Sequence, residues 1–429
     1  RFRRPAGVGR EGGVGAMRWT RSLAVVYVNI ALYALCFQLQ RPIEPFLVEK
    51  LGAKGGDAAM SYGALQSFFS LMQTAGSLAM GVLLDKLGAR WSFVLCYASS
   101  AASYWLLSVS TSLPILYLSK VPTFFQAGFL VAQALIAQET SEEDRASALG
   151  RATTAYTAGA TLGPLLGGWL GASGNYYFGA KLAVAGSLLS VGLSLLLPSA
   201  PAPGAAEGGP AKGRAGFAKM AAVALRPTVL MVLATKLAAS VGSSISQTVF
   251  PLVLKDGFGV AEGGMGVAMS TMMVVNSVVG AVVIGPFTKM YTPRRLVPAC
   301  IFAKACCEAA LALLAPGSTA AALLPASAHA SLPFACCFVV GSVFQFALAT
   351  TLTVISTSTV GKDEQGSLMG VEHAMFSGAR IGTPTLATWL FASGGAPLVS
   401  GTCASMSLGL LLAVHGLVLP HIAPAKKLR

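Results

Sequence analysis

Residues 150–171 read GRATTAYTAGATLGPLLGGWLG. The stretch opens beside one charged residue, Arg151, and is uncharged from there to Gly171. It has the length, about 20 residues, that a helix needs to span a bilayer, although glycine and proline both weaken helices. A spanning helix in lipid must satisfy its own backbone hydrogen bonds, and its small residues let a neighbouring backbone approach closely. The stretch therefore predicts a membrane-spanning helix that packs tightly against other helices.

The whole chain has the composition of a protein that crosses the membrane many times. Of its 429 residues, 54% are hydrophobic and 11% are charged, whereas soluble domains carry about 25% charged residues. Apolar runs of about 20 residues recur along the chain, and the sequence lacks the alternating pattern of membrane β-strands. We expect an all-α membrane protein with twelve spans, at 22–46, 61–84, 91–110, 113–138, 146–170, 176–197, 227–253, 264–288, 295–315, 332–360, 366–392 and 396–420.

The net charge is +14, and the positions of the basic residues indicate how the chain is oriented in the membrane. If the N-terminus is cytoplasmic, the predicted inner segments hold 21 of the 30 Lys and Arg residues, and the outer segments hold Lys50, Lys54 and Lys255. Cytoplasmic loops of membrane proteins carry this excess of basic residues in every type of membrane. The distribution places both termini in the cytoplasm and argues against nucleic acid as a partner.

The predicted spans divide into two related halves. Residues 142–164 align with 361–384 at an offset of 220, and the intervening stretch 198–226 is rich in Pro, Gly and Ala, as flexible linkers are. Such a duplicated unit is typical of transporters, in which the site lies between the repeats. We expect a basic tail over 1–21, a six-helix bundle over 22–197, a cytoplasmic linker over 198–226, a second six-helix bundle over 227–420 and a basic tail over 421–429.

A short charged loop, GVLLDKLGAR, follows the second predicted span at 81–90. Gly81 allows close approach of a helix, and Gly88 allows a tight turn. Asp85 can face the positive N-terminal end of a neighbouring helix, while Lys86 and Arg90 add basic charge. We interpret the loop as part of a gate; a solvated turn placed only by its charges is the alternative.

The opening stretch contains a regular glycine pattern. Three of its glycines lie four residues apart and therefore on one helix face, where another backbone can pack closely. Pro164 removes one backbone hydrogen bond and bends the helix. The full pattern comprises Gly150, Gly159, Gly163, Pro164, Gly167 and Gly168. A packing face without any further role is the alternative, because small residues at this spacing are common in membrane helices.

These two motifs resemble the signatures of the major facilitator superfamily, and the similarity covers about residues 18–420. Residues 81–90 match its loop signature G-x3-D-[RK]-x-G-x-[RK], and 150–168 match the antiporter pattern of its twelve-span drug:proton antiporters. Within that type the chain is most similar to organic cation transporter-like solute carriers and tetracycline-exporter-like proteins. The resemblance implies two six-helix bundles, a gate in which Asp85 faces the eleventh span and Lys86 and Arg90 take part, and a seal against inward leak at the fifth span.

Several ionisable residues are predicted at membrane depth, where each costs several kcal/mol unless it faces a cavity or a partner. Those on the spans that flank the central pathway of this superfamily are Arg41, Glu44, Lys120, Lys236, Glu372, His373 and Arg380. By depth, the basic residues 120, 236 and 380 could reach one midplane cavity, and separate structural ion pairs are the alternative. Lys304 and Glu308, one helical turn apart on a peripheral span, predict a structural ion pair.

Proton coupling needs a group whose protonation changes with substrate or conformation. Glu44 lies between Pro42 and Pro45 in a stretch that predicts a broken helix, and is the first candidate. His373 is the second candidate, with a satisfied packing histidine as its alternative. Lys120 stands where related transporters have an arginine, and lysine can lose its proton when it is desolvated, as arginine effectively cannot.

The expected function is secondary active transport of a small organic solute by alternating access, as a proton-coupled antiporter. The chain is expected to work as a monomer in the lipid bilayer, driven by a proton gradient, with no cofactor, metal site or catalytic residue. The family resemblance favours organic cations, whereas the basic residues near the predicted cavity favour an anionic or zwitterionic solute. The alternatives are an uncoupled facilitator of the same fold and a transport-dead scaffold that docks partners through its basic linker.

Overall fold

The computed structural model describes residues 20–53, 56–198, 222, 224–283, 286, 290–318, 331–361 and 364–418, and within these residues every predicted span contains helix. The expected basic tails and most of the expected linker lie outside these residues. The α-helices are α1 (Arg21–Gln38), α2 (Glu44–Lys50), α3 (Gly56–Ser108), α4 (Leu113–Leu118), α5 (Gly128–Glu139), α6 (Glu142–Gly171), α7 (Phe178–Ser194), α9 (Pro227–Leu252), α10 (Glu262–Val278), α12 (Pro293–Leu314), α13 (Ser331–Ser358) and α14 (Gln365–Ala413). Short 3-10 or π-helical segments are η1 (Val121–Phe125), η2 (Val253–Gly257), η3 (Val279–Val283) and η7 (Val414–Val418). The expected all-α membrane fold is confirmed.

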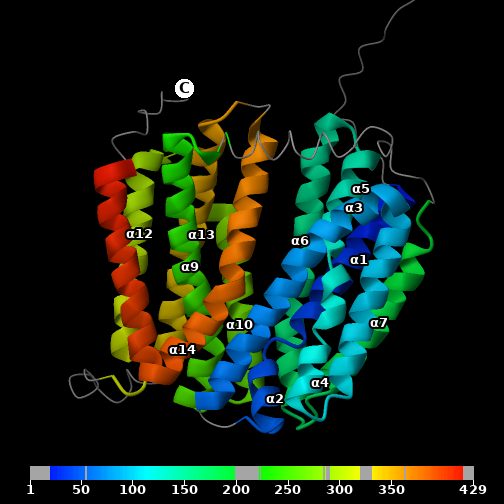
Figure 1. Ribbon diagram of the computed structural model, residues 1–429, viewed down its shortest axis with the longest axis horizontal. Coiled ribbons are helices and arrows are strands. Elements are labelled where there is room, and N and C mark those ends of the chain that lie inside the picture. Colours follow the sequence, from blue (N-terminus) through cyan, green and yellow to red (C-terminus); the bar gives the residue numbers. More distant parts are fainter. Residues whose placement is uncertain are drawn as a thin grey trace, which may run out of the picture.

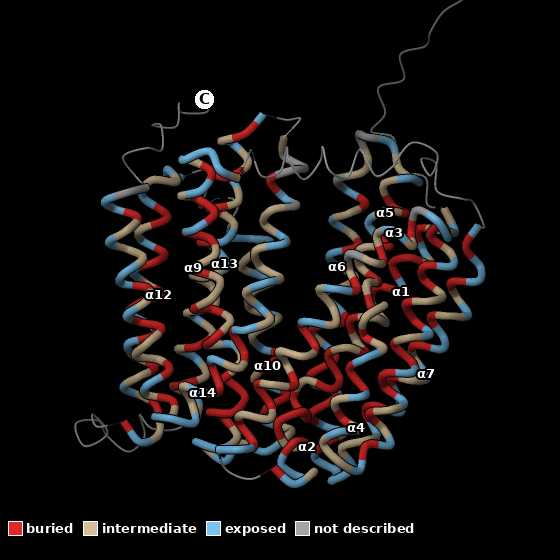
Figure 2. Tube along the Cα trace, viewed as in Figure 1, coloured by how far each residue is buried: buried red, intermediate tan, exposed pale blue. Residues whose placement is uncertain are grey.

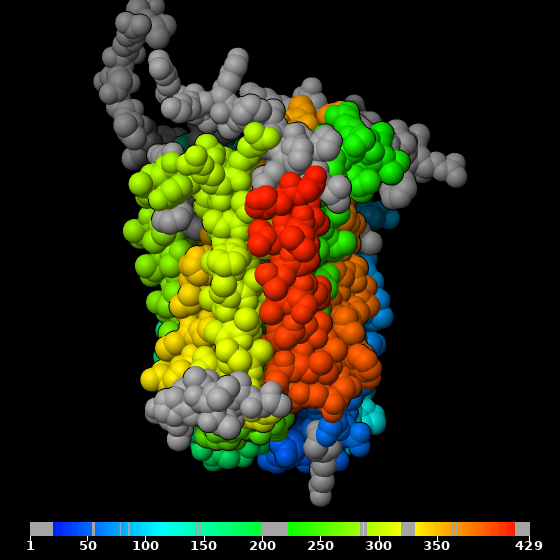
Figure 3. All heavy atoms as spheres, turned by 90° about the vertical axis from the view of Figure 1, so that its left-hand side faces the viewer, coloured from blue at the N-terminus to red at the C-terminus, as the bar shows by residue number. Residues whose placement is uncertain are grey.

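The helices form two bundles that lie side by side (Figure 1). Helices α1 to α7 make the first bundle, in which α1 packs against α6 and α7. Helices α9 to α14 make the second, and its outer face shows the last part of α14 lying along α12 (Figure 3). The most extensive contacts between the bundles are those of α6 with α10 and of α3 with α14.

Eight helical stretches among the described residues are long and apolar enough to cross a membrane. The labels α3 and α14 each cover two helices that meet at a non-helical break: Gly88 in α3, where φ is 73°, and Gly394 with Gly395 in α14. The predicted span boundaries at 84–91 and 392–396 coincide with these breaks. The apolar helix α7 has 17 residues, and the number of twelve crossings remains a prediction.

Two predicted spans are broken. Helix α1 ends at Gln38, and a turn over 39–43 leads to α2, which begins at Glu44 as the flanking prolines predict. The predicted span at 113–138 matches the membrane-length stretch Leu113–Glu139, within which α4 ends at Leu118 and α5 begins at Gly128. The intervening η1 contains Pro122 and presses its backbone onto α3: a Cβ built on Gly76 would lie 1.6 Å from the Phe124 carbonyl oxygen.

Buried residues line the inside of each bundle and the zone between the bundles near α2 and α10 (Figure 2). Stacked aromatic rings hold each interior together, with ring centroids 5.6 Å apart for Phe93 and Tyr97 and 3.9 Å apart for Phe250 and Phe338. Apolar side chains also cover the outer faces, as for Trp169 and Leu412. This apolar exterior is what a bilayer requires.

Candidate functional site

The bundles touch at one end of the molecule. We call the end where α1 begins and η7 stops the terminal end, and the opposite end the closed end (Figure 1). Polar contacts join the bundles at the closed end: Ser67 with Thr385 (2.8 Å), Ser270 with the Thr161 carbonyl (2.8 Å), Lys255 with Glu49 (2.5 Å) and Tyr176 with Glu262 (2.5 Å). These contacts hold α3 against α14, α6 against α10, and η2 against α2.

The glycines of α6 bring two other backbones into contact with this helix. A Cβ on Gly159 would lie 2.1 Å from the Ala31 carbonyl oxygen of α1, and one on Gly167 would lie 2.1 Å from that of Leu39. Gly163 packs on the same helix, where its Cβ would meet Gln38. The close packing that the four-residue spacing predicts is confirmed, and its partner is α1.

A second face of α6 packs on the other bundle. A Cβ on Gly168 would lie 2.5 Å from the Glu262 carbonyl oxygen of α10, and one on Gly266 would lie 2.4 Å from that of Pro164. Backbone therefore meets backbone between the bundles at this point. The remaining glycine of the pattern, Gly150, has no neighbour within 4 Å of such a Cβ.

The α6–α10 interface opens toward the terminal end. Residues 150, 154, 161 and 168 share one face of α6, because intervals of four and seven residues return to the same side of a helix. Thr161 and Gly168 of this face contact α10, whereas Thr154 and Gly150 are exposed. The same face thus changes from packed to open along its length.

The α3–α14 interface is also packed near the closed end and open toward the terminal end. A Cβ on Gly63 of α3 would meet the side chain of Thr388 and, at 2.8 Å, the carbonyl oxygen of Pro384. Arg380 and His373 continue this face of α14 toward the terminal end, four and eleven residues before Pro384, and both are exposed. The two interfaces together describe bundles that are joined at the closed end and separated at the terminal end.

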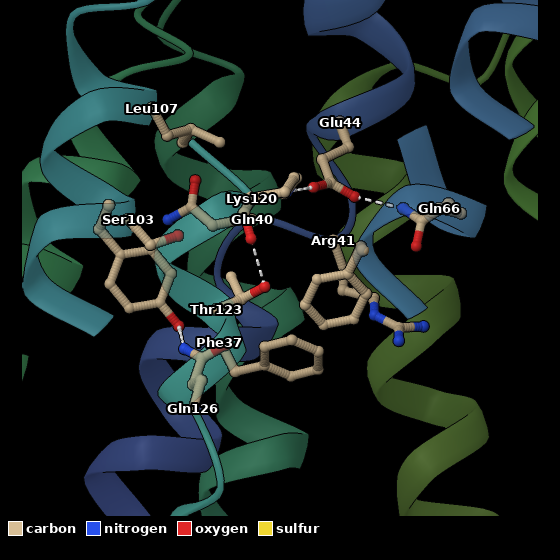
Figure 4. A pocket seen from close by; sticks show the side chains of 12 residues that line it. Phe37, Gln40, Arg41, Glu44, Gln66, Ser103, Leu107, Lys120, Thr123 and Gln126 are labelled. Atoms are coloured by element: carbon tan, nitrogen blue, oxygen red, sulfur yellow. Dashed lines mark hydrogen bonds and ion pairs between the residues drawn. The ribbon is translucent and has the colours of Figure 1, made fainter. Parts of the chain in front are cut away.

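Glu44 and Lys120 form a buried ion pair in the first bundle. Both occupy helix breaks, since Glu44 begins α2 and Lys120 lies between α4 and η1. The Gln66 side chain of α3 donates to the second carboxylate oxygen of Glu44 at 2.6 Å. All three line a cavity of ≈ 30 Å³ together with Arg41 (Figure 4), which is enough for a water molecule.

The guanidinium of Arg41 points away from this ion pair (Figure 4) and lies over the Phe37 ring, 5.4 Å from its centroid. Arg41 is half-buried. Within the described part of the chain, neither Arg41 nor Arg380 has a carboxylate at ion-pair distance. Two arginines therefore remain without an acidic partner there.

Lys236 belongs to a separate cluster in the second bundle. Its ammonium lies 2.6 Å from Glu372 and also donates to Thr353 at 3.1 Å, while Ser356 donates to the same Glu372 oxygen at 2.9 Å. The expectation that residues 120, 236 and 380 reach one cavity is wrong, because each lysine is turned to the carboxylate of its own bundle. The predicted ion pair between Lys304 and Glu308 is confirmed.

The loop of 81–90 joins the two helical parts of α3 at the terminal end. Gly88 makes the predicted turn with a positive φ of 73°, but close approach of a helix at Gly81 is wrong for this structure, because no atom lies within 4 Å of a Cβ there. Lys86 is exposed, and Arg90 lies over the Trp91 ring at 5.6 Å. The side chain of Asp85 lies outside the described residues, so its predicted contact with α14 remains a prediction.

The local sequence does not predict the contacts of three residues in these sites. The signal for Gln66 is an amide within an apolar span, and that for Glu372 is a carboxylate at membrane depth, which does not identify its lysine partner. Gly266 belongs to the run EGGMG at 262–266, whose small residues resemble those of the fifth span. The pairing of each with its partner depends on helix packing and is not contained in the local sequence.

Comparison with known proteins agrees with this architecture. Residues 26–371 match the family model of the Major Facilitator Superfamily. The chain is 26% identical over 401 residues to solute carrier family 22 member 18 of Mus musculus, covering 91% of this chain and 94% of that protein. It is 25% identical over 386 residues to the class C tetracycline resistance protein of Escherichia coli, covering 88% of this chain and 91% of that protein.

Among solved structures, the fold is similar to that of the human organic anion transporter MFSD10 (TETRAN). The TM-score is 0.62 at 18% sequence identity, covering 91% of this chain and 98% of that one. This similarity is one of overall fold. The match of the family model over most of the chain, the two bundles and the paired motifs lead to one conclusion: this protein belongs to the Major Facilitator Superfamily.

Proposed function

We propose that this chain, a secondary transporter of the Major Facilitator Superfamily and not an enzyme, exchanges a small organic solute for protons by alternating access. The observation that carries the proposal is the position of the Glu44–Lys120 ion pair. It is buried beside a cavity at two helix breaks, and it lies in the bundle that must move against the other.

Protonation of Glu44 would remove the charge that holds Lys120 in place. A buried lysine without its carboxylate is costly, so proton binding at Glu44 favours rearrangement of α2 and of η1. These two segments adjoin the closed end, where Glu49 of α2 binds Lys255 of the other bundle. Through these contacts, protonation of Glu44 would be coupled to the interactions that hold the two bundles together.

The separated terminal end supports a state that is open toward the cytoplasm, since the basic charge of the sequence places the termini there. In the opposite state, the exposed faces of Gly150 on α6 and Arg380 on α14 would close. We propose that the 81–90 loop stabilises that state and that one chain suffices for the cycle. The similarity to a tetracycline resistance protein supports export of the solute.

Proton flux from proteoliposomes that contain a pH-sensitive dye tests this proposal. The protein is challenged with matched cationic, zwitterionic and anionic solutes, with Glu44→Gln in parallel. We expect solute-dependent proton movement that Glu44→Gln abolishes. Glu308→Gln is the matched control, because it also removes a buried carboxylate from a lysine but leaves an acceptor for Ser407 and lies in a peripheral helix.

Each contrary result points to a definite alternative. Proton movement that survives Glu44→Gln would transfer the coupling role to another group, with His373 next in order. Solute uptake that moves no protons would make the chain an uncoupled facilitator. Retention of the folded protein with no flux of any solute would favour a scaffold.

A further inference from the structure

In the described part of the chain, the basic side chains at membrane depth outnumber the carboxylates that could pair with them. Glu44, Glu308 and Glu372 are each engaged by a lysine of their own bundle. The three pairs leave Arg41 and Arg380, neither of which has an acidic partner within the described residues. Arg380 is exposed and Arg41 is half-buried, and charged residues at membrane depth that face a water-filled opening mark substrate pathways.

The two arginines come from opposite bundles and face the space between them. Arg380 lies on the same face of α14 as Pro384 and Thr388, at intervals of four residues, and that face packs on Gly63 of α3. The face carrying Arg380 is therefore turned toward the first bundle. The next turn of α14 toward the terminal end places Ser377 beside it.

A hydrogen bond between α3 and α14 indicates that Arg41 lies at a depth in the molecule close to that of Arg380. Ser67 of α3 bonds Thr385 of α14 at 2.8 Å, and the residue before Ser67 is Gln66, which lines the cavity of Figure 4 with Arg41. Thr385 is five residues from Arg380, which is about 7.5 Å along a helix. Arg380 also lies in electrostatic range of Arg41 and of Tyr156 on α6.

We propose that Arg41 and Arg380 together bind an anionic group, a carboxylate or a phosphate, of the transported solute between the bundles. A guanidinium offers a planar pair of donors that matches both groups. Phe37 beneath Arg41 provides an apolar surface next to that site. Among the described residues, a purely cationic solute would meet two positive charges there, while Glu44 and Glu372 are engaged by lysines. This inference rests on the proposed function, since it needs bundles that separate around a solute.

Charged reagents that modify a cysteine thiol measure the electrostatic potential at this site, and the experiment does not require the solute to be known. Ser377→Cys changes one oxygen to sulfur beside Arg380, in the full chain reconstituted in phosphatidylcholine liposomes, which contain no anionic lipid. The probes are the anionic 2-sulfonatoethyl and the cationic 2-trimethylammonioethyl methanethiosulfonates. Mass spectrometry of the modified peptide separates this site from the native cysteines. The ratio of the modification rates of the two reagents at this cysteine is divided by the ratio of their rates with free 2-mercaptoethanol, which corrects for their different intrinsic reactivity.

We expect the anionic reagent to be favoured by about tenfold, because two cations within several ångströms attract one reagent and repel the other. Arg41→Gln and Arg380→Gln should each reduce this preference. Lys181→Gln, which removes an exposed charge from α7, is the control and should leave it unchanged. Phenyl phosphate and benzoate should slow modification more than benzylamine does, and Arg380→Gln should remove that protection.

The outcomes separate this inference from the proposed function. Equal rates for both reagents, or a preference that survives both arginine variants, would overturn the anion site while leaving the separated bundles intact. A thiol that neither reagent reaches would overturn the open terminal end itself, and with it both proposals. If Ser377→Cys fails to fold, His373→Cys on the same face replaces it.

Discussion

At the scale of residues, lysine rather than arginine neutralises the buried carboxylates. All three buried pairs of the described chain, Glu44–Lys120, Glu372–Lys236 and Glu308–Lys304, use a lysine. Two of them connect helices that are distant in sequence, whereas the third lies within α12. A compact ammonium suits this role, and arginine remains for planar recognition. The lysine at position 120, which departs from the family pattern, is consistent with that division.

The pair within α12 should behave as a structural element. Lys304→Met leaves Glu308 buried without its cation, which should cost about 3–5 kcal/mol. The double variant Lys304→Met/Glu308→Gln removes both charges and keeps an acceptor for Ser407, so most of the stability should return. Thermal unfolding of the purified protein in detergent measures both. Equal losses in the single and double variants would contradict this account.

At the scale of elements, the packing of α6 against α1 depends on glycines, because a residue with a Cβ would not fit at these positions. Gly159→Ala would force a Cβ to within 2.1 Å of the Ala31 carbonyl oxygen, and overpacking of this kind costs about 1–3 kcal/mol. We expect a lower unfolding temperature and less folded protein in the membrane, measured by size-exclusion chromatography and thermal unfolding.

Gly150→Ala is the control in the same helix. No atom lies within 4 Å of its Cβ, and alanine is favoured over glycine in helices by about 1 kcal/mol, so stability should stay the same or rise. A similar destabilisation by both changes would show that helix propensity, and not the contact with α1, accounts for the effect.

The sequence predicts the elements better than their junctions. Apolar length alone locates the helices, because lipid leaves the backbone no other solution. The charged loop also locates one junction, because Gly88 breaks α3 with a positive φ of 73° where the sequence predicts a turn. The break of the fourth span at η1 depends on the approach of Gly76 from another helix, which no local pattern encodes.

The candidate site was predictable in its members and not in its partners. The ionisable residues stand out because charge is rare at membrane depth. That Lys120 turns to Glu44, 76 positions earlier, and Lys236 to Glu372, 136 positions later, follows from bundle packing. Only Lys304 and Glu308 could be paired in advance, because one helical turn separates them.

At the scale of the whole molecule, the closed end holds the two bundles in their present relation. Ser67→Cys/Thr385→Cys replaces two hydroxyls that lie 2.8 Å apart on α3 and α14, a separation that a disulfide can close with small movements. Oxidation should lock the bundles and abolish solute transport, and a reducing agent should restore it. Transport assays before and after reduction test this.

The single variants Ser67→Cys and Thr385→Cys are the controls and should be insensitive to oxidation. In the locked double variant, the thiol of an added Ser377→Cys should remain reachable from the terminal end, because that end is already separated. Full transport in a chain shown by mass spectrometry to carry the cross-link would refute a cycle that opens the closed end.

The glycine contact between α6 and α10 has a mechanical consequence. Gly168 and Gly266 meet as bare backbone, so no side chains interdigitate between the bundles at that point. If the bundles rock as proposed, one helix can roll over the other at this contact without a change of side-chain rotamer. We then expect the barrier to turnover at the surrounding polar contacts, Ser67–Thr385 and Lys255–Glu49, which must separate, rather than at the glycine contact itself.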